Sequence, residues 1–246
     1  MSTLKSLLFL VLSIISTSAF SQQGNNVTDS LSGYVNIQVD ISGLKDTSGV
    51  FSIRIGGKTL QYSKQNNILS AKCYIDEPKR SYFTFHSHQT IANNADKPLN
   101  EIATKYLDYY EFFALPGELH IVAKNTVHNS HIINASKPQL DYASVLRQEE
   151  ASNLKFAIAN KGLLLQISPS IFEKRAIQAH EKFKNDVVLK YIKANPDSPT
   201  AVWLLDQYYN SGNANNNLLA SLHQNFTDRI KALPTAKYIY QKVNNL

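Results

Sequence analysis

The spacing of the hydrophobic residues changes once along this chain of 246 residues, at Pro138. Before Pro138, apolar residues alternate with polar ones, as in Val35 to Ile41, which is the two-residue period of a half-buried strand. After Pro138, they recur every three or four residues, as on an amphipathic helix. This change predicts an α+β fold: an antiparallel β-sandwich or barrel-like domain over residues 31–138, followed by a helical bundle region over residues 139–246.

The first 21 residues have the pattern of a secretory signal peptide. Lys5 supplies the positive charge, residues 7–15 are almost wholly apolar, and Ala19-Phe20-Ser21 is a small-x-small cleavage site. Cleavage near Ser21/Gln22 predicts a mature chain that lies in the periplasm or is secreted. It would begin with a flexible polar leader, residues 22–30. No later apolar run is as long as a membrane span, so we expect no transmembrane segment after cleavage.

The segment from Tyr110 to Ile121 has the composition of a β-hairpin. Its first half is rich in aromatic residues, including Phe112 and Phe113, and Pro116-Gly117 is a pair that favours a tight turn. Apolar and polar residues alternate again beyond the turn. We therefore expect Phe112, Phe113, Pro116 and Gly117 to form a structural hairpin whose aromatic side chains mostly serve the core.

Proline, glycine and asparagine residues divide the second half of the chain into helical segments. The second segment begins at Ser168-Pro169, where serine can cap a helix and proline is tolerated in the first turn. We expect helices over about residues 140–162, 168–195, 197–212, 218–230 and 235–243.

The charge and the cysteine content exclude two kinds of chemistry. The formal net charge is +6, and the basic residues are spread along the chain, so we expect a solvated basic surface and no nucleic-acid binding. Cys73 is the only cysteine, so no disulfide can form within the chain. Its position in an alternating segment with Leu69 and Ile75 favours a buried, inert thiol over a reactive thiol or an intermolecular disulfide.

His86 and His88 are candidate metal ligands. Residues two apart on a strand point to the same side, so both imidazoles could bind one zinc or copper ion. The sequence shows no third ligand beside them, which favours surface histidines, and we expect no metal site. The sequence also lacks Gly-x-Ser-x-Gly, His-Glu-x-x-His, a phosphate-binding loop and a dinucleotide fingerprint. We therefore expect no catalytic and no cofactor-binding residues.

Residues 110–121 resemble the Phe-Phe-x-x-Pro-Gly-x-Ile hallmark of a domain of unknown function. That domain lies at the N-terminus of exported thioredoxin-like proteins of Bacteroidota, the TlpA-like (AhpC/TSA-type) thiol-disulfide oxidoreductases. Asn67-Ile68-Leu69, Glu77-Pro78 and residues 136–142 are similar to its other landmarks. Residues 195–199, Asn-Pro-Asp-Ser-Pro, are similar to part of the helical connector that follows it. The resemblance covers about residues 31–246.

The resemblance implies an accessory role, because the relatives carry a thioredoxin domain with Cys-x-x-Cys after the helices and this chain ends at Leu246. A thiol-disulfide cycle needs an attacking and a resolving thiol, which one cysteine cannot supply. We expect a periplasmic, non-catalytic interaction module that self-associates or docks on an envelope protein, such as a thioredoxin-like protein in trans. Two alternatives stay open. One is an envelope small-molecule or glycan binder with a pocket between sheet and helices near residues 87–105, and the other is an oxidoreductase truncated before its catalytic domain.

Overall fold

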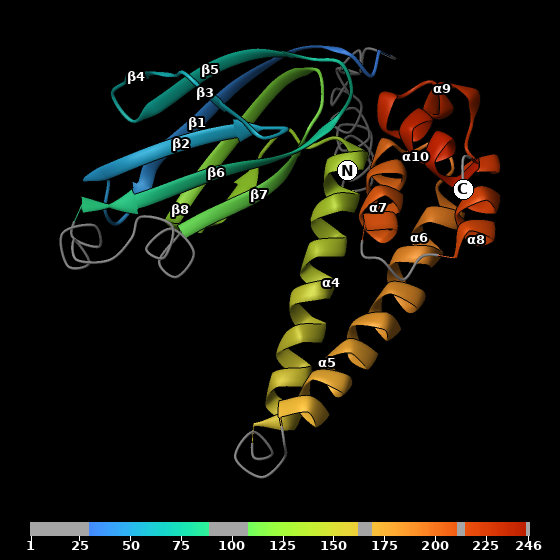
Figure 1. Ribbon diagram of the computed structural model, residues 1–246. Helices are drawn as coiled ribbons and strands as arrows, with labels where there is room; N and C mark the ends of the chain where they lie inside the picture. The colour runs from blue at the N-terminus through green and yellow to red at the C-terminus, as the bar shows by residue number, and fades with distance from the viewer. Residues whose placement is uncertain (1–29, 89–107, 162–168, 211–214, 245–246) are drawn as a thin grey trace, which may run out of the picture.

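The computed structural model describes residues 30–88, 108–161, 169–210 and 215–244. The predicted signal peptide, nearly all of the predicted leader and most of the 87–105 loop lie outside these residues. Within them, strands fill the first half and helices the second, so the predicted α+β fold is confirmed (Figure 1). The strands are β1 (Gly33–Leu44), β2 (Gly49–Ile55), β3 (Lys58–Leu60), β4 (Ser63–Gln65), β5 (Ile68–Ile75), β6 (Lys79–Ser87), β7 (Asp108–Ala114) and β8 (Gly117–Ile132).

In the described residues the strands form two four-stranded sheets that share one core. The strand orders are β4-β5-β1-β8 and β3-β2-β6-β7, and every pair is antiparallel except β1 with β8, which is parallel. The alternating residues of β1, Val35 to Ile41, are at most 1 % exposed, as their two-residue period predicts. They pack against the other sheet, where Phe51 stacks on Phe83 and Phe85. The β half is therefore a sandwich.

The predicted hairpin at Pro116-Gly117 is wrong. The strands on its two sides belong to different sheets, because β7 pairs with β6 and β8 pairs with β1. The chain turns a corner from one sheet to the other there, and Gly117 adopts a φ of +112°, a backbone conformation that favours glycine. Alternation marks which face of a strand is buried, but it does not select the strand that pairs with it.

The reversal that the sequence suggested lies instead within β8. The backbone N–H of Ile133 donates to the carbonyl of His120 at 3.0 Å. An extended chain would place residues 13 apart roughly 40 Å from each other, so β8 folds back between them. Asn125, with a φ of +66°, is the last residue of β8 that pairs with β1, so it lies just before the return. Residues 130–132 are the last part of this return.

The helices begin and end close to the proline, glycine and asparagine residues at which the sequence predicts their boundaries. They are α4 (Lys137–Asn160), α5 (Pro169–Phe183), the π-helical turn η1 (Lys184–Val188), α6 (Leu189–Ala194), α7 (Pro199–Asn210), α8 (Asn216–Gln224), α9 (Asp228–Lys231) and α10 (Pro234–Asn244). The segment expected as one helix over 168–195 contains the π-helical turn, and the segment over 218–230 divides into α8 and α9. Among the described residues, no helix is both long enough and apolar enough to cross a membrane.

A second hydrophobic core lies among the helices and is built from α6, α7, α8 and α10, with Ile192, Leu205, Leu219 and Ile239 at most 2 % exposed. Figure 1 shows these helices gathered beside the sandwich, while α4 and α5 run away from both as a long pair. Polar contacts join the two cores. Thr235 at the start of α10 donates its backbone N–H and its hydroxyl to Glu77, which ends the turn after β5, at 2.8 and 2.7 Å.

Candidate functional site

A buried carboxylate, Glu111 of β7, holds the helices onto the sandwich. Its side chain is 9 % exposed and accepts two hydrogen bonds from the guanidinium of Arg80 on β6, both at 2.7 Å. The phenol of Tyr142 on α4 donates to the same carboxylate. A buried charge is tolerated when it is paired and hydrogen-bonded, and these three side chains meet that condition for each other.

Aromatic rings enclose this ion pair. Tyr142 lies 5.3 Å from Phe113 of β7 and 5.1 Å, edge to face, from Trp203 of α7, measured between ring centroids. The guanidinium of Arg80 lies over the rings of Tyr82 and Trp203, at 5.0 and 5.4 Å. This cluster is therefore where two strands, β6 and β7, contact two helices, α4 and α7, and it is partly shielded from solvent.

Arg80, Tyr142 and Tyr82 keep their ordinary charge states at neutral pH. Burial lowers the pKa of Arg80, but the hydrogen bonds and charge of Glu111 outweigh burial and hold that pKa above its ordinary value. Burial, followed by the Glu111 charge, raises the pKa of Tyr142 far above its ordinary value and raises the pKa of Tyr82 to about 12. A general acid or base works best with a pKa near the operating pH, so this arrangement is suited to holding elements together rather than to proton transfer.

A cleft of about 830 Å³ lies where three segments singled out in the sequence meet. Its walls are the corner residues 115–118, residues 134–139 at the start of α4, and residues 194–199 between α6 and α7. The Ser136–Gln139 pair helps to shape it. The Gln139 side-chain oxygen accepts from the backbone N–H of Ser136 at 2.8 Å, and its amide donates to the carbonyl of Phe113 at 3.1 Å. Thus the landmarks of the resemblance lie side by side in space.

Two carboxylates in this cleft are already bonded to neighbouring side chains. Asp141 accepts from Lys137 at 2.6 Å and from the Tyr191 phenol at 2.9 Å. Asp197 accepts from Arg229 at 2.7 Å and from Thr227 at 2.6 Å, and these hydrogen bonds, led by that of Arg229, lower its pKa. These carboxylates therefore stabilise the turns that form the walls of the cleft.

A groove of about 470 Å³ lies between α4 and the edge formed by β7 and the returning part of β8, and we call it the α4 groove. Tyr109 and Tyr110 line one side, and Arg147, Glu150 and other α4 side chains line the other. Ser130 lines it from β8. The Ser130 side chain is buried, and its hydroxyl has no hydrogen-bond partner in the part of the chain that the structure describes.

The π-helical turn η1 buries a charged side chain. Lys184 is 7 % exposed and bonds Glu181 at 3.1 Å, and it lies over the ring of Tyr208 at 5.8 Å. A hollow of about 550 Å³ there is also lined by Trp203 and Asp206. Burial, more than any neighbouring charge, raises the pKa of the Asp206 carboxyl. Because the lysine is paired, its burial has a structural explanation.

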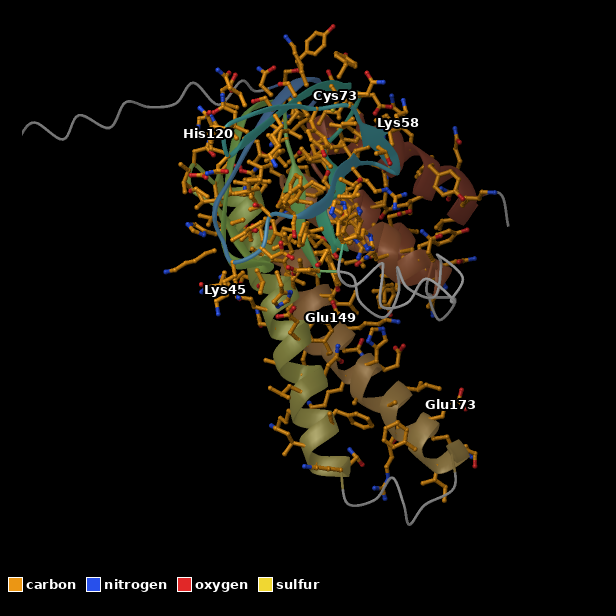
Figure 2. The ribbon with its side chains drawn as sticks, turned by 90° about the vertical axis from the view of Figure 1, so that its left-hand side faces the viewer. Lys45, Lys58, Cys73, His120, Glu149 and Glu173 are labelled. Carbon is orange, nitrogen blue, oxygen red and sulfur yellow. The ribbon has the colours of Figure 1, made fainter. Side chains whose placement is uncertain are left out.

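Apolar side chains are exposed along the α4–α5 pair beyond the body of the protein. We call residues 147–160 of α4 and 170–180 of α5 the arm. Leu154, Ile158, Ile171 and Ile177 are 62, 67, 46 and 51 % exposed. The two helices touch through Phe156 and Phe172, whose centroids are 5.4 Å apart. Figure 2 shows the arm leaving the body beyond Glu149, with Glu173 near its far end.

The sequence-predicted site residues do not come together with these features. His86 and His88 lie at the end of β6, and the described residues contain no group of three or more His, Cys, Asp or Glu side chains that could hold a metal ion. Cys73 is half-buried on β5 rather than fully buried, and burial raises the pKa of its thiol. In Figure 2 it lies in the sandwich, far from Glu149.

Phe112 and Phe113 are both buried, but on opposite sides of β7: Phe112 in the sandwich core and Phe113 against Tyr142.

Sequence reasoning missed the Arg80–Glu111–Tyr142 cluster and the unpaired Ser130. Glu111 does carry a signal, because it is the one acid within the aromatic run from Tyr109 to Phe113. Its partner Arg80 is 31 residues away, which no local pattern shows. Comparison of the sequence with models of known protein families found no match. Comparisons with curated proteins and with solved structures likewise found none.

Proposed function

We propose that this protein is an exported, non-catalytic interaction module that binds a second copy of itself through the arm. In this proposal a signal peptide of residues 1–21 and a leader of residues 22–30 precede a β-rich domain, residues 31–138, and a helical region, residues 139–246. The mature protein acts in the periplasm or outside the cell. Its kinship with the N-terminal domain of thioredoxin-like oxidoreductases is part of the proposal and rests on the resemblance of residues 110–121, 136–142 and 195–199.

The exposed apolar side chains of the arm carry this proposal. Leu154 and Ile158 are four residues apart, so they are neighbours on one face of α4. Beyond Val145, which is buried, α4 contributes mainly half-buried Phe156 and buried Asn160 to its contact with α5. Helices in proteins are stabilised mostly by packing of an apolar face, and contiguous exposed apolar surface marks sites of interaction. The arm therefore has an apolar face that a partner would cover.

A second copy fits this face for two reasons. Leu154 and Ile158 are each two residues from Phe156, which contacts α5, so their stripe lies on the side of α4 away from α5, where the same stripe of a second copy would cover it. The arm also carries side chains of both signs, such as Glu150, Lys155, Glu173 and Lys174, so two arms do not meet as surfaces of one charge. The contact is small. A face about 20 Å long and one helix wide, about 10 Å, gives roughly 200 Å² on each copy, which is far below the standard interface of about 800 Å² on each partner. We therefore expect a weak dimer whose population rises with concentration.

Sedimentation equilibrium of the mature chain, residues 22–246, tests the proposal over a range of concentrations. The wild type should pass from monomer to dimer, and the double variant Leu154→Glu/Ile158→Glu should stay monomeric because it places four carboxylates in the contact. Ile133→Glu is the matched control, since Ile133 is 61 % exposed but lies outside the arm. Unchanged thermal unfolding would show that the variants fold. A wild type that stays monomeric throughout, or a double variant that dimerises as well as the wild type, would refute the proposal.

A further inference from the structure

We propose that the α4 groove binds a neutral oligosaccharide. This site adjoins the base of the arm, with which it shares residues of the 147–153 segment of α4, and it would add a ligand to the interaction module. Its volume of about 470 Å³ lies in the usual range of small-molecule sites, roughly 300–1,000 Å³. The groove lies between one face of α4 and the β7–β8 edge, so its two walls come from different secondary-structure elements.

The unpaired hydroxyl of Ser130 is the first observation behind this proposal. Ser130 lines the groove and is 8 % exposed, and its oxygen has no hydrogen-bond partner among the described residues. Buried polar groups in folded proteins are nearly always hydrogen-bonded, so an exception calls for a partner that the protein alone does not supply. A ligand hydroxyl can serve as both donor and acceptor for a serine hydroxyl.

The exposed ring of Tyr109 is the second observation, because the C–H face of a sugar ring packs on the face of an aromatic ring. Tyr109 is 42 % exposed, and its ring is fixed by an edge contact with Tyr82 at 6.3 Å. Tyr110 borders the groove from the other side of β7, where its half-buried ring stacks on Phe112 at 6.0 Å against the sandwich core, so Tyr109 alone offers a ring face to the ligand. Burial raises the pKa of Tyr110 to about 12, so its phenol is uncharged at neutral pH. An apolar ring with a polar tip suits a ligand that has both apolar and polar surfaces.

The charges around the groove favour a neutral ligand. Apart from the Arg80–Glu111 ion pair, the lining carries Arg147, Glu149 and Glu150, one positive and two negative groups. Two carboxylates would repel a phosphate or nucleotide, and Arg147 would repel a simple cation. His128, which lies 3.9 Å from Glu150 at the rim, and Asn153 add groups that donate and accept. A polyol can satisfy donors and acceptors of both kinds.

Titration of the ¹⁵N-labelled mature chain with maltotriose, cellotriose and chitotriose, followed by NMR, tests the site. At least one trisaccharide should shift the amide signals of residues 109–111, 128–132 and 143–150. Ser130→Ala and Tyr109→Ala should each weaken that binding at least about tenfold, the effect of losing one good contact. Tyr34→Ala, which removes an exposed tyrosine from the sandwich, is the matched control and should bind as the wild type does.

The Ser130→Ala variant also separates binding from folding. Removing an unpaired buried hydroxyl should leave the stability unchanged or raise it, so weaker binding by this variant cannot be attributed to unfolding. Three outcomes would overturn the proposal: no trisaccharide shifts these signals, inorganic phosphate shifts them more than any trisaccharide does, or Ser130→Ala and Tyr109→Ala bind as tightly as Tyr34→Ala.

Discussion

Tyr142 of α4 donates its phenolic hydrogen to Glu111 of β7, the same carboxylate that binds both Nε and Nη2 of Arg80. One hydrogen bond thus connects α4 to a charge that would otherwise belong to the sheet alone. Because Tyr142 is 1 % exposed and contacts both Phe113 and Trp203, this bond lies where the sandwich, α4 and α7 converge.

Replacing Tyr142 with phenylalanine should lower the free energy of unfolding by about 1–3 kcal/mol, because it leaves a buried carboxylate short of one donor while keeping the ring. Urea unfolding of residues 22–246 measures the change. Tyr34→Phe, on a tyrosine that is 58 % exposed, serves as the control and should change stability by less than about 0.5 kcal/mol. Equal values for the two variants would show that the hydrogen bond adds nothing.

Gly117→Ala should destabilise the protein by about 1–3 kcal/mol through backbone strain. Gly117 has a φ of +112°, and a Cβ there would meet no atom within 4 Å, so steric contact contributes nothing. The exposed Lys124→Ala on the same strand should shift stability by less than about 0.5 kcal/mol. Thermal unfolding compares the two, and a stable Gly117→Ala variant would contradict the positive φ at the corner.

The stability should fall as pH drops below about 6.5 because of His223. Burial, followed by the charge of Lys231, lowers the pKa of His223 below its ordinary value of 6.5. The unfolded chain therefore binds a proton at this site before the folded chain does. The contribution is present above pH 6.5 and is lost as pH falls toward the folded-state pKa. His223→Gln should flatten the dependence of the unfolding free energy on pH between about 7 and 5. If this variant keeps the slope of the wild type, another group is responsible.

Cys73 should react slowly with a disulfide reagent such as DTNB. The thiolate is the reactive form, and burial raises the pKa of this thiol, so little thiolate is present near neutral pH. We expect a rate at pH 7.5 at least about tenfold lower for the folded chain than for the chain in urea. Comparable rates in the two conditions would show an accessible, activated thiol and would revive a redox role.

Particular residues show how much of this structure the sequence could predict. The alternation of Val35 to Ile41 and the proline at 169 correctly indicate a buried strand face and a helix start, because both depend on neighbours within a few residues. Pro116-Gly117 correctly indicates a change of direction. The strand on the far side of that turn pairs with β1 rather than β7, and this choice depends on residues about 80 positions away.

The candidate sites were less predictable than the fold. Ser130 and Leu154 have no distinctive neighbours, since an unpaired hydroxyl and an exposed leucine become visible only when the surrounding elements are placed. The Glu111 carboxylate was visible as an acid among aromatic residues, but its burial with Arg80 and Tyr142 was not. Phe113 was expected in the core, and the structure places it between β7 and α4 instead of between the sheets.

The sequence by itself determined the two periods of the chain, the places where its helices start and stop, and the presence of a single thiol, because each of these follows from local sterics, local hydrogen bonding or composition. Tertiary structure alone decided which strands pair, which charges share a buried site, and which apolar side chains remain exposed on the arm. Those properties are set by contacts between segments distant in sequence, whose free energies no short stretch of residues contains.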